Sequence, residues 1–105
     1  MTVYTSGDWL VMPGHEQEFV DAWLEFAHQS NTEFGQGGWG MLLRDKDEPR
    51  HFISVGSWPD ERAVEQWRAS HTFRHGVESV RIHVEDMTIR TLDHAAEVGR
   101  VATRA

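Results

Sequence analysis

The sequence of 105 residues contains no cysteine. This absence excludes a disulfide framework, a thiolate nucleophile, an iron–sulfur cluster and a cysteine-ligated zinc site. Long apolar runs are also missing, as is an N-terminal basic segment followed by an apolar core, so we expect neither a membrane span nor a signal peptide and predict a cytoplasmic protein. Lysine and arginine are few, 10 against 17 aspartates and glutamates, and the net charge of −7 argues against nucleic acid as a partner.

Aromatic residues, in contrast, are abundant. Five tryptophans and five phenylalanines in a chain of this length supply far more apolar surface than a disordered protein carries. The length suits one hydrophobic core and leaves no room for a second. We therefore assign residues 1–94 to a single globular domain, and the charged, alanine-rich segment 95–105 to a C-terminal tail.

The order of the expected elements is strand, helix, strand, strand, helix, strand. Alternating or helical spacing of apolar residues defines these elements, and Asp60 and Ser70 are good helix N-caps. The order predicts an α+β fold of the ferredoxin-like split βαβ type, with an antiparallel sheet and the helices on one of its faces. The expected ranges are a strand at 3–12, a helix from 16 to about 31, a loop at 32–38, hairpin strands at 39–44 and 51–58, short helices after residues 60 and 70, and a strand at 80–92 with a bulge near 85 and 86.

The expected strands are apolar on both faces of the sheet. Leu42 accompanies Met41 and Leu43 in one hairpin strand, so neighbouring apolar side chains must point in opposite directions. Helices cover one face only, and a second copy of the same sheet would cover the other. We therefore predict a homodimer, with Asp8 on the dimer-facing side of the first strand.

The segment GGWGMLLRDKDEPRHFISVGSWPDERAVEQWRASHTFRHG carries a spaced pattern of glycine, aromatic and turn residues. A glycine and an aromatic precede the second strand, Asp and Pro mark the hairpin turn, a Trp ends the third strand, and Trp-x-x-Ser-x-x-Phe follows. In this pattern the chain resembles the antibiotic biosynthesis monooxygenase family of dimeric α+β barrels, up to about residue 92. The matching positions are Gly38, Trp39, Asp45, Pro49, Trp58, Trp67, Ser70 and Phe73.

The resemblance implies a mostly apolar pocket in each subunit, between the sheet and the helices. It also implies oxygenation of anthrones, quinols or aromatic polyketides by dioxygen without metal or flavin, and in one branch the opening of bound haem. Such cofactor-free chemistry requires a substrate that forms a stabilised carbanion or phenolate, which the protein binds, desolvates and helps to deprotonate. Trp67 matches the tryptophan that lines the pocket in much of the family and is a catalytic candidate.

Further aromatic and histidine residues are candidates for the site. Phe19, Trp23, Phe26 and Phe73 are expected to bind substrate, although an aromatic stripe at helical spacing also serves core packing. His71 and His75 share a helix face and could act as the base. We do not assign them a metal, since no third ligand is evident, and we assign no chemistry to the remaining histidines, which are His15, His28, His51, His83 and His94.

The haem-degrading branch combines an asparagine on the first strand, the helical tryptophan and an iron-ligating histidine about ten residues later. Here Gly7 occupies the asparagine position and Val77 the histidine position, with His75 two residues early, so only Trp67 matches. Haem degradation and haem binding through His75 are therefore alternatives to the cofactor-free oxygenase. A further alternative is a dimer that binds an aromatic or haem-like ligand without turning it over.

Overall fold

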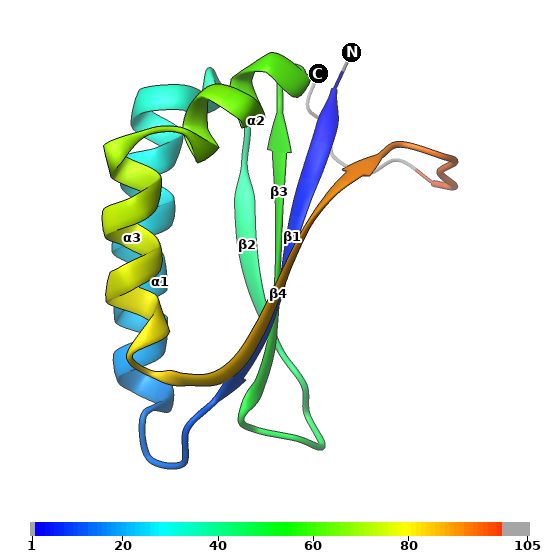
Figure 1. Cartoon of the computed structure of the whole chain (residues 1–105). Helices are drawn as coiled ribbons and strands as arrows, with labels where there is room; N and C mark the ends of the chain where they lie inside the picture. The colour runs from blue at the N-terminus through cyan, green and yellow to red at the C-terminus, as the bar shows by residue number, and fades with distance from the viewer. Residues whose placement is uncertain (1, 100–105) are drawn as a thin grey trace.

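The computed structural model describes residues 2–99. Helices and a four-stranded sheet form two layers, with α1 and α3 side by side on one face of the sheet and α2 near one of its ends (Figure 1). The elements are β1 (Val3–Val11), α1 (Glu16–Ser30), the π-helical turn η1 (Asn31–Gly35), β2 (Gly40–Arg44), β3 (His51–Trp58), α2 (Glu61–Arg68), α3 (His71–Arg81) and β4 (Val84–Asp93).

The sheet has the strand order β2-β3-β1-β4, and all of its strand pairs are antiparallel. The two central strands, β3 and β1, are not consecutive in the chain, because each half of the molecule crosses over through helical segments. This topology confirms the predicted α+β fold with a ferredoxin-like sheet.

Strand β1 shows how the residue pattern sets the two faces. Its odd-numbered residues from Val3 to Val11 are buried and its even-numbered residues are partly exposed. Because side chains alternate along a strand, the buried set faces the helices. Several large apolar side chains of the other strands lie on the opposite face and remain exposed in the single chain, namely Met41, Leu43, Ile53 and Leu92 at 46%, 51%, 40% and 39%.

Side-chain caps begin the two shorter helices. The Ala63 N–H donates to the Asp60 carboxylate at 2.9 Å, and the Phe73 N–H donates to the Ser70 hydroxyl at 3.1 Å. Both bonds satisfy amide groups that a helix N-terminus otherwise leaves unpaired. These caps confirm the starts predicted for α2 and α3.

Two expected boundaries are wrong. The loop predicted for 32–38 begins as the π-helical turn η1, which continues α1 directly before a left-handed Gln36 ends it. The strand predicted for 80–92 starts only at Val84, because Val80 completes the apolar face of helix α3 and is fully buried there. The predicted bulge is present, since Leu10 pairs with Asp86 while Val11 pairs with Val84.

The core lies between the sheet and α1, α2 and α3. Its largest fully buried side chain, Phe19, packs between Trp9 and Phe52 at centroid distances of 5.6 and 5.0 Å. None of the helices in residues 2–99 has the length and apolar character that a bilayer crossing requires. Of the predicted tail, residues 95–99 contain no helix or strand, and the remainder lies outside the described residues.

Candidate functional site

A cavity of about 230 Å³ opens between the inner face of the sheet and the C-terminal half of α1. Indole and phenyl rings form much of its wall, and small residues of β1 and β3 together with residues of the C-terminal half of α1 and of η1 form most of the rest. The aromatic residues that line it are Trp9, Trp23, Phe26, Trp39, Trp58, Trp67 and Phe73.

Trp67 stands at the centre of an aromatic cluster beside the cavity. Its ring lies 4.5 Å from that of Trp58 and 4.8 Å from that of Phe73, and it stacks on Phe26 at 5.8 Å. Trp67 is 8% exposed, so these contacts hold the ring in one orientation while one edge still reaches the cavity. The arrangement provides a rigid apolar surface suited to flat rings.

Each of the most buried indoles donates its N–H to a hydroxyl group that also lines the cavity. Trp9 donates to Ser54 at 3.0 Å, Trp58 to Thr5 at 2.9 Å and Trp67 to Ser30 at 2.8 Å. A hydroxyl that accepts such a bond still has its own hydrogen to donate. The cavity wall therefore contains hydroxyl groups that the indoles orient as donors.

Gly7 provides part of the space in the cavity. A Cβ atom at this position would lie 2.5 Å from Trp9 Nε1 and 2.6 Å from Ser54 Oγ, so any side chain would disturb that hydrogen bond. The asparagine that the haem-degrading branch carries on the first strand therefore does not fit here with Trp9 and Ser54 in place. The lack of space at Gly7 agrees with the absence of the haem-degrading branch's asparagine from this position of the sequence.

The structure brings some of the predicted site residues together and separates others. Trp67, Trp23, Phe26 and Phe73 line the cavity, whereas Phe19 is wholly buried in the core and does not. His71 and His75 stack on each other with ring centroids 5.8 Å apart on the exposed side of α3, and neither lines the cavity. A haem held by His75 is therefore incompatible with this cavity.

His28, in the last turn of α1, was not expected at the site. It is the one side chain with a titratable group among the described residues that line the cavity. Asn31 adds an amide beside it. Helical spacing gives no signal for His28, because residues two and five positions apart on a helix do not share a face, and His28 is exposed while Phe26 is buried.

Three groups have shifted pKa values, and none of them lines the cavity: burial lowers the pKa of Arg68 on α2, and the other two, His51 and Asp45, lie close to each other. His51 Nε2 contacts the Asp8 carboxylate at 2.5 Å, and this hydrogen bond raises the pKa of His51 above its usual value. Backbone N–H groups of Asp47 and Glu48 lower the pKa of Asp45, whose carboxylate is 3.8 Å from His51. Asp8 thus points away from the cavity, as its position next to Gly7 predicted.

A family model described as antibiotic biosynthesis monooxygenase matches residues 6–79. The chain belongs to the antibiotic biosynthesis monooxygenase family. The match includes most of the first strand, the long helix, the hairpin, α2 and most of α3. Family membership confirms the resemblance seen in the sequence and supports a monooxygenase function.

Solved structures agree with the antibiotic biosynthesis monooxygenase fold. A mutant of SnoaB, a cofactor-independent oxygenase from Streptomyces nogalater, superposes with a TM-score of 0.82 at 17% identity, over 94% of this chain and 98% of that one. The crystal structure of an antibiotic biosynthesis monooxygenase superposes with a TM-score of 0.74 at 20% sequence identity, over 90% of this chain and 99% of that one. A conserved protein from Methanosarcina mazei Go1 superposes with a TM-score of 0.77 at 15% sequence identity, over 90% of this chain and 94% of that one. At these identities the likeness shows the fold, and no curated protein sequence matches the chain.

Proposed function

We propose that this protein is a cofactor-independent monooxygenase that oxidises a planar, electron-rich aromatic compound of the anthrone or quinol type with dioxygen. The observation that carries the proposal is the aromatic cavity whose lining includes three hydroxyl groups that each accept an indole N–H. Its volume of about 230 Å³ favours a substrate of two or three fused rings over a larger one.

The reaction begins with removal of a proton from the substrate. The conjugate anion of an anthrone or quinol carries its charge on an oxygen atom as well as on carbon, and hydroxyl donors stabilise such an oxyanion in a site that excludes water. Ser30, Ser54 and Thr5 are suitable donors, because their oxygens already accept an indole N–H. The aromatic walls hold the rings by stacking.

Oxygen then enters the substrate. The anion gives one electron to dioxygen, and the resulting radical and superoxide combine into a peroxide. Loss of water from this peroxide converts the original CH₂ carbon of an anthrone into a carbonyl, so one oxygen atom is incorporated and the other leaves as water. No external reductant is needed, since the substrate supplies all of the electrons.

His28 is the proposed base, in place of His71 and His75. It lines the cavity, whereas the other two lie on the outside of α3. A neutral imidazole near physiological pH accepts a proton readily. Asn31, one helical turn further along, would help to place the substrate oxygen near this base.

Oxygen consumption with a panel of anthrones and quinols tests the proposal. We expect turnover by the wild type, a loss of at least about tenfold in kcat for His28→Gln, and unchanged rates for the control variant His71→Gln/His75→Gln. Equal rates for His28→Gln and the wild type would remove His28 from the mechanism. No oxygen uptake with any member of the panel would contradict the oxygenase function.

The second candidate is a protein that binds an aromatic ligand without turnover. It is favoured by the absence of any buried titratable group among the described residues that line the cavity, since His28 is exposed. The same panel separates the two. Quenching of tryptophan fluorescence on addition of an anthrone, without oxygen uptake, would support the binding protein.

We also propose that the chain forms a homodimer through the open face of its sheet. Met41, Leu43, Ile53 and Leu92 are exposed there in the single chain, and apolar side chains gathered on one sheet face favour association. Light scattering at micromolar concentration should give twice the mass of 12.1 kDa. Ile53→Asp should shift the protein to the monomer, whereas Ile82→Asp, a change at an exposed residue after α3, should not.

A further inference from the structure

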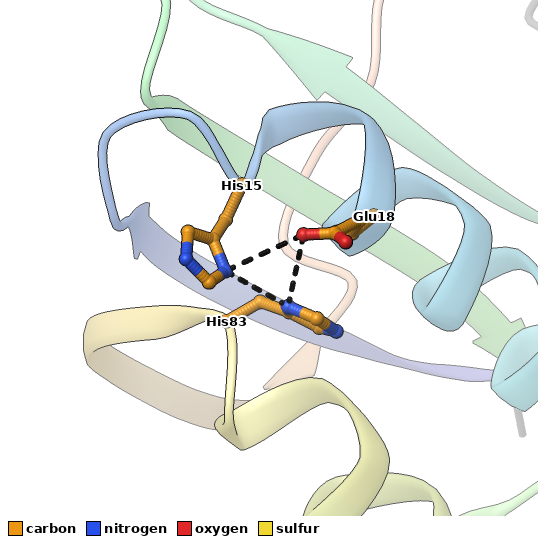
Figure 2. A group of neighbouring side chains, drawn as sticks. All are labelled: His15, Glu18 and His83. Atoms are coloured by element: carbon orange, nitrogen blue, oxygen red, sulfur yellow. Dashed lines mark hydrogen bonds and ion pairs between the residues drawn. The ribbon is translucent and has the colours of Figure 1, made fainter.

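Two histidines and one glutamate meet at the end of the molecule where β1 turns into α1. Figure 2 shows the side chains of His15, Glu18 and His83 pointing toward one another. The Nδ1 atoms of His15 and His83 are 3.1 Å apart. Glu18 Oε1 lies 3.6 Å from His15 Nδ1 and 3.9 Å from His83 Nδ1, which closes a triangle of potential ligand atoms.

Segments far apart in the sequence hold this triangle together. His15 directly precedes α1 and Glu18 lies in its first turn, whereas His83 follows α3 and precedes β4. The Met12 N–H donates to the His83 carbonyl oxygen at 3.0 Å, and the His15 N–H donates to the Met12 carbonyl oxygen at 3.0 Å. Backbone bonds therefore fix the two histidines next to each other before any ligand binds.

Hydrogen bonding accounts for only part of this arrangement. One imidazole can donate from Nδ1 to the other at 3.1 Å. The carboxylate oxygen, at 3.6 and 3.9 Å, is beyond hydrogen-bond distance from both rings. A tetrahedral zinc ion with bonds of about 2.0–2.2 Å requires ligand atoms about 3.3–3.5 Å apart, and the three observed separations lie on both sides of that value.

We propose that His15, Glu18 and His83 form a binding site for a divalent transition-metal ion, with Zn²⁺ as its best-fitting occupant. Two imidazole nitrogens and one carboxylate oxygen are ligands that zinc accepts, and water would complete the tetrahedron. Mg²⁺ and Ca²⁺ are poor candidates because they prefer oxygen ligands alone. The net charge of −7 favours a cation, and Glu18 supplies a negative charge directly at the site.

The site is accessible and is separate from the aromatic cavity. The side chain of His83 is 15% exposed, that of His15 37% and that of Glu18 66%, so an ion and its water can enter from solvent. None of these residues lines the cavity. A bound ion would join the turn between β1 and α1 to the turn between α3 and β4, and would stabilise the folded state by binding it in preference to the unfolded chain.

Calorimetric titration of the metal-free protein with ZnCl₂ tests the proposal. The surface pair His71 and His75 could also hold zinc, so the titration uses both the wild type and a His71→Ala/His75→Ala variant. We expect one zinc ion per chain in the variant and a rise in its Tm with zinc. Substitution of His15 or His83 by Ala in that background should weaken binding by at least about tenfold.

Substitution of the Glu18 carboxylate can be compared with a matched control on the same helix turn, and both variants leave the two histidines unchanged. Glu18→Gln removes the proposed ligand, whereas Glu16→Gln removes a carboxylate of the same helix turn that is not in the triangle. Zinc affinity should fall by about tenfold or more in the first and stay within about twofold in the second. Equal effects of the two, or zinc binding that disappears entirely with His71 and His75, would overturn the proposal.

Discussion

Substitution of Gly76 by alanine changes the free energy of unfolding in two opposite ways, through helix propensity and through steric overlap with Phe26. Gly76 lies in the middle of α3, where alanine normally stabilises a helix by about 1 kcal/mol relative to glycine. Here a Cβ atom would lie only 2.0 Å from Cδ1 of Phe26 on α1, so the ring would have to recede by about 1.4 Å to reach ordinary contact at 3.4 Å. Overpacking of this kind costs about 1–3 kcal/mol.

The overlap is severe, because three atoms of the Phe26 ring lie within 2.6 Å of the added carbon. We therefore expect the steric cost to exceed the helix gain, and Gly76→Ala to lower the free energy of unfolding by about 1–2 kcal/mol. Phe26 also lines the aromatic cavity, so its displacement should weaken the binding of an aromatic ligand.

Urea denaturation of a double-mutant cycle measures this effect at one fixed protein concentration. The cycle comprises the wild type, Gly76→Ala, Phe26→Leu and the double variant. In the Phe26→Leu background the smaller side chain gives room, and alanine should then be neutral or stabilising, with a coupling energy of about 1 kcal/mol or more. If Gly76→Ala stabilised the wild type and showed no coupling, the close approach of α1 and α3 would be refuted.

Three further variants probe the two faces of the sheet. Asp8 raises the pKa of His51 above its usual 6.5, so the protonated ring stabilises the fold below about pH 6.5 and this contribution is lost as the pH rises through the folded-state pKa. The loss of unfolding free energy in His51→Gln should therefore be largest below about pH 6.5 and should shrink as the pH rises through the folded-state pKa of His51. Gly7→Ala should disrupt the Trp9 hydrogen bond and abolish ligand-induced fluorescence quenching. Trp67→Phe should leave its buried hydroxyl acceptor without an indole donor and lower the free energy of unfolding in urea by about 1–2 kcal/mol.

Each of these variants has an outcome that would contradict its reasoning. A pH-independent effect of His51→Gln would mean that the contact with Asp8 does not favour the protonated ring. Unchanged quenching in Gly7→Ala would place the ligand elsewhere. A fully stable Trp67→Phe would show that the indole N–H contributes nothing to the fold.

The sequence predicts the fold well because local signals agree with the global arrangement. Alternation in β1, the caps at Asp60 and Ser70 and the order of elements all point to the same topology. The boundary at Val80 is different, since this residue fits both an alternating strand and the apolar face of α3. Only packing against the core, which fully buries it, decides in favour of the helix.

The aromatic residues illustrate what helical spacing can and cannot reveal. Phe19 and Trp23 lie one turn apart on α1, and the spacing puts both on the inward side. Which of them meets empty space depends on the side chains across the interface. Phe19 meets Trp9 and Phe52 in the core, whereas Trp23 reaches the cavity wall beyond them.

The sequence is least informative about which histidines belong to a functional site. His71 and His75 attract attention because they are four positions apart on one helix, yet they lie outside the cavity. His15 and His83 are 68 positions apart and come within 3.1 Å only through the return of β4 alongside β1. His28 reaches the cavity only because α1 continues to this point over the sheet.

Strand β1 is an inner strand of the sheet, and its successive side chains lie on opposite faces. Gly7 borders the cavity, and its neighbour Asp8 lies on the face where a second subunit would pack. A ligand that displaces this strand would therefore alter the strength of subunit association. By thermodynamic reciprocity, pairing of the subunits would change the ligand's affinity by the same factor. Strand β1 would then couple ligand binding in the cavity to association of the subunits.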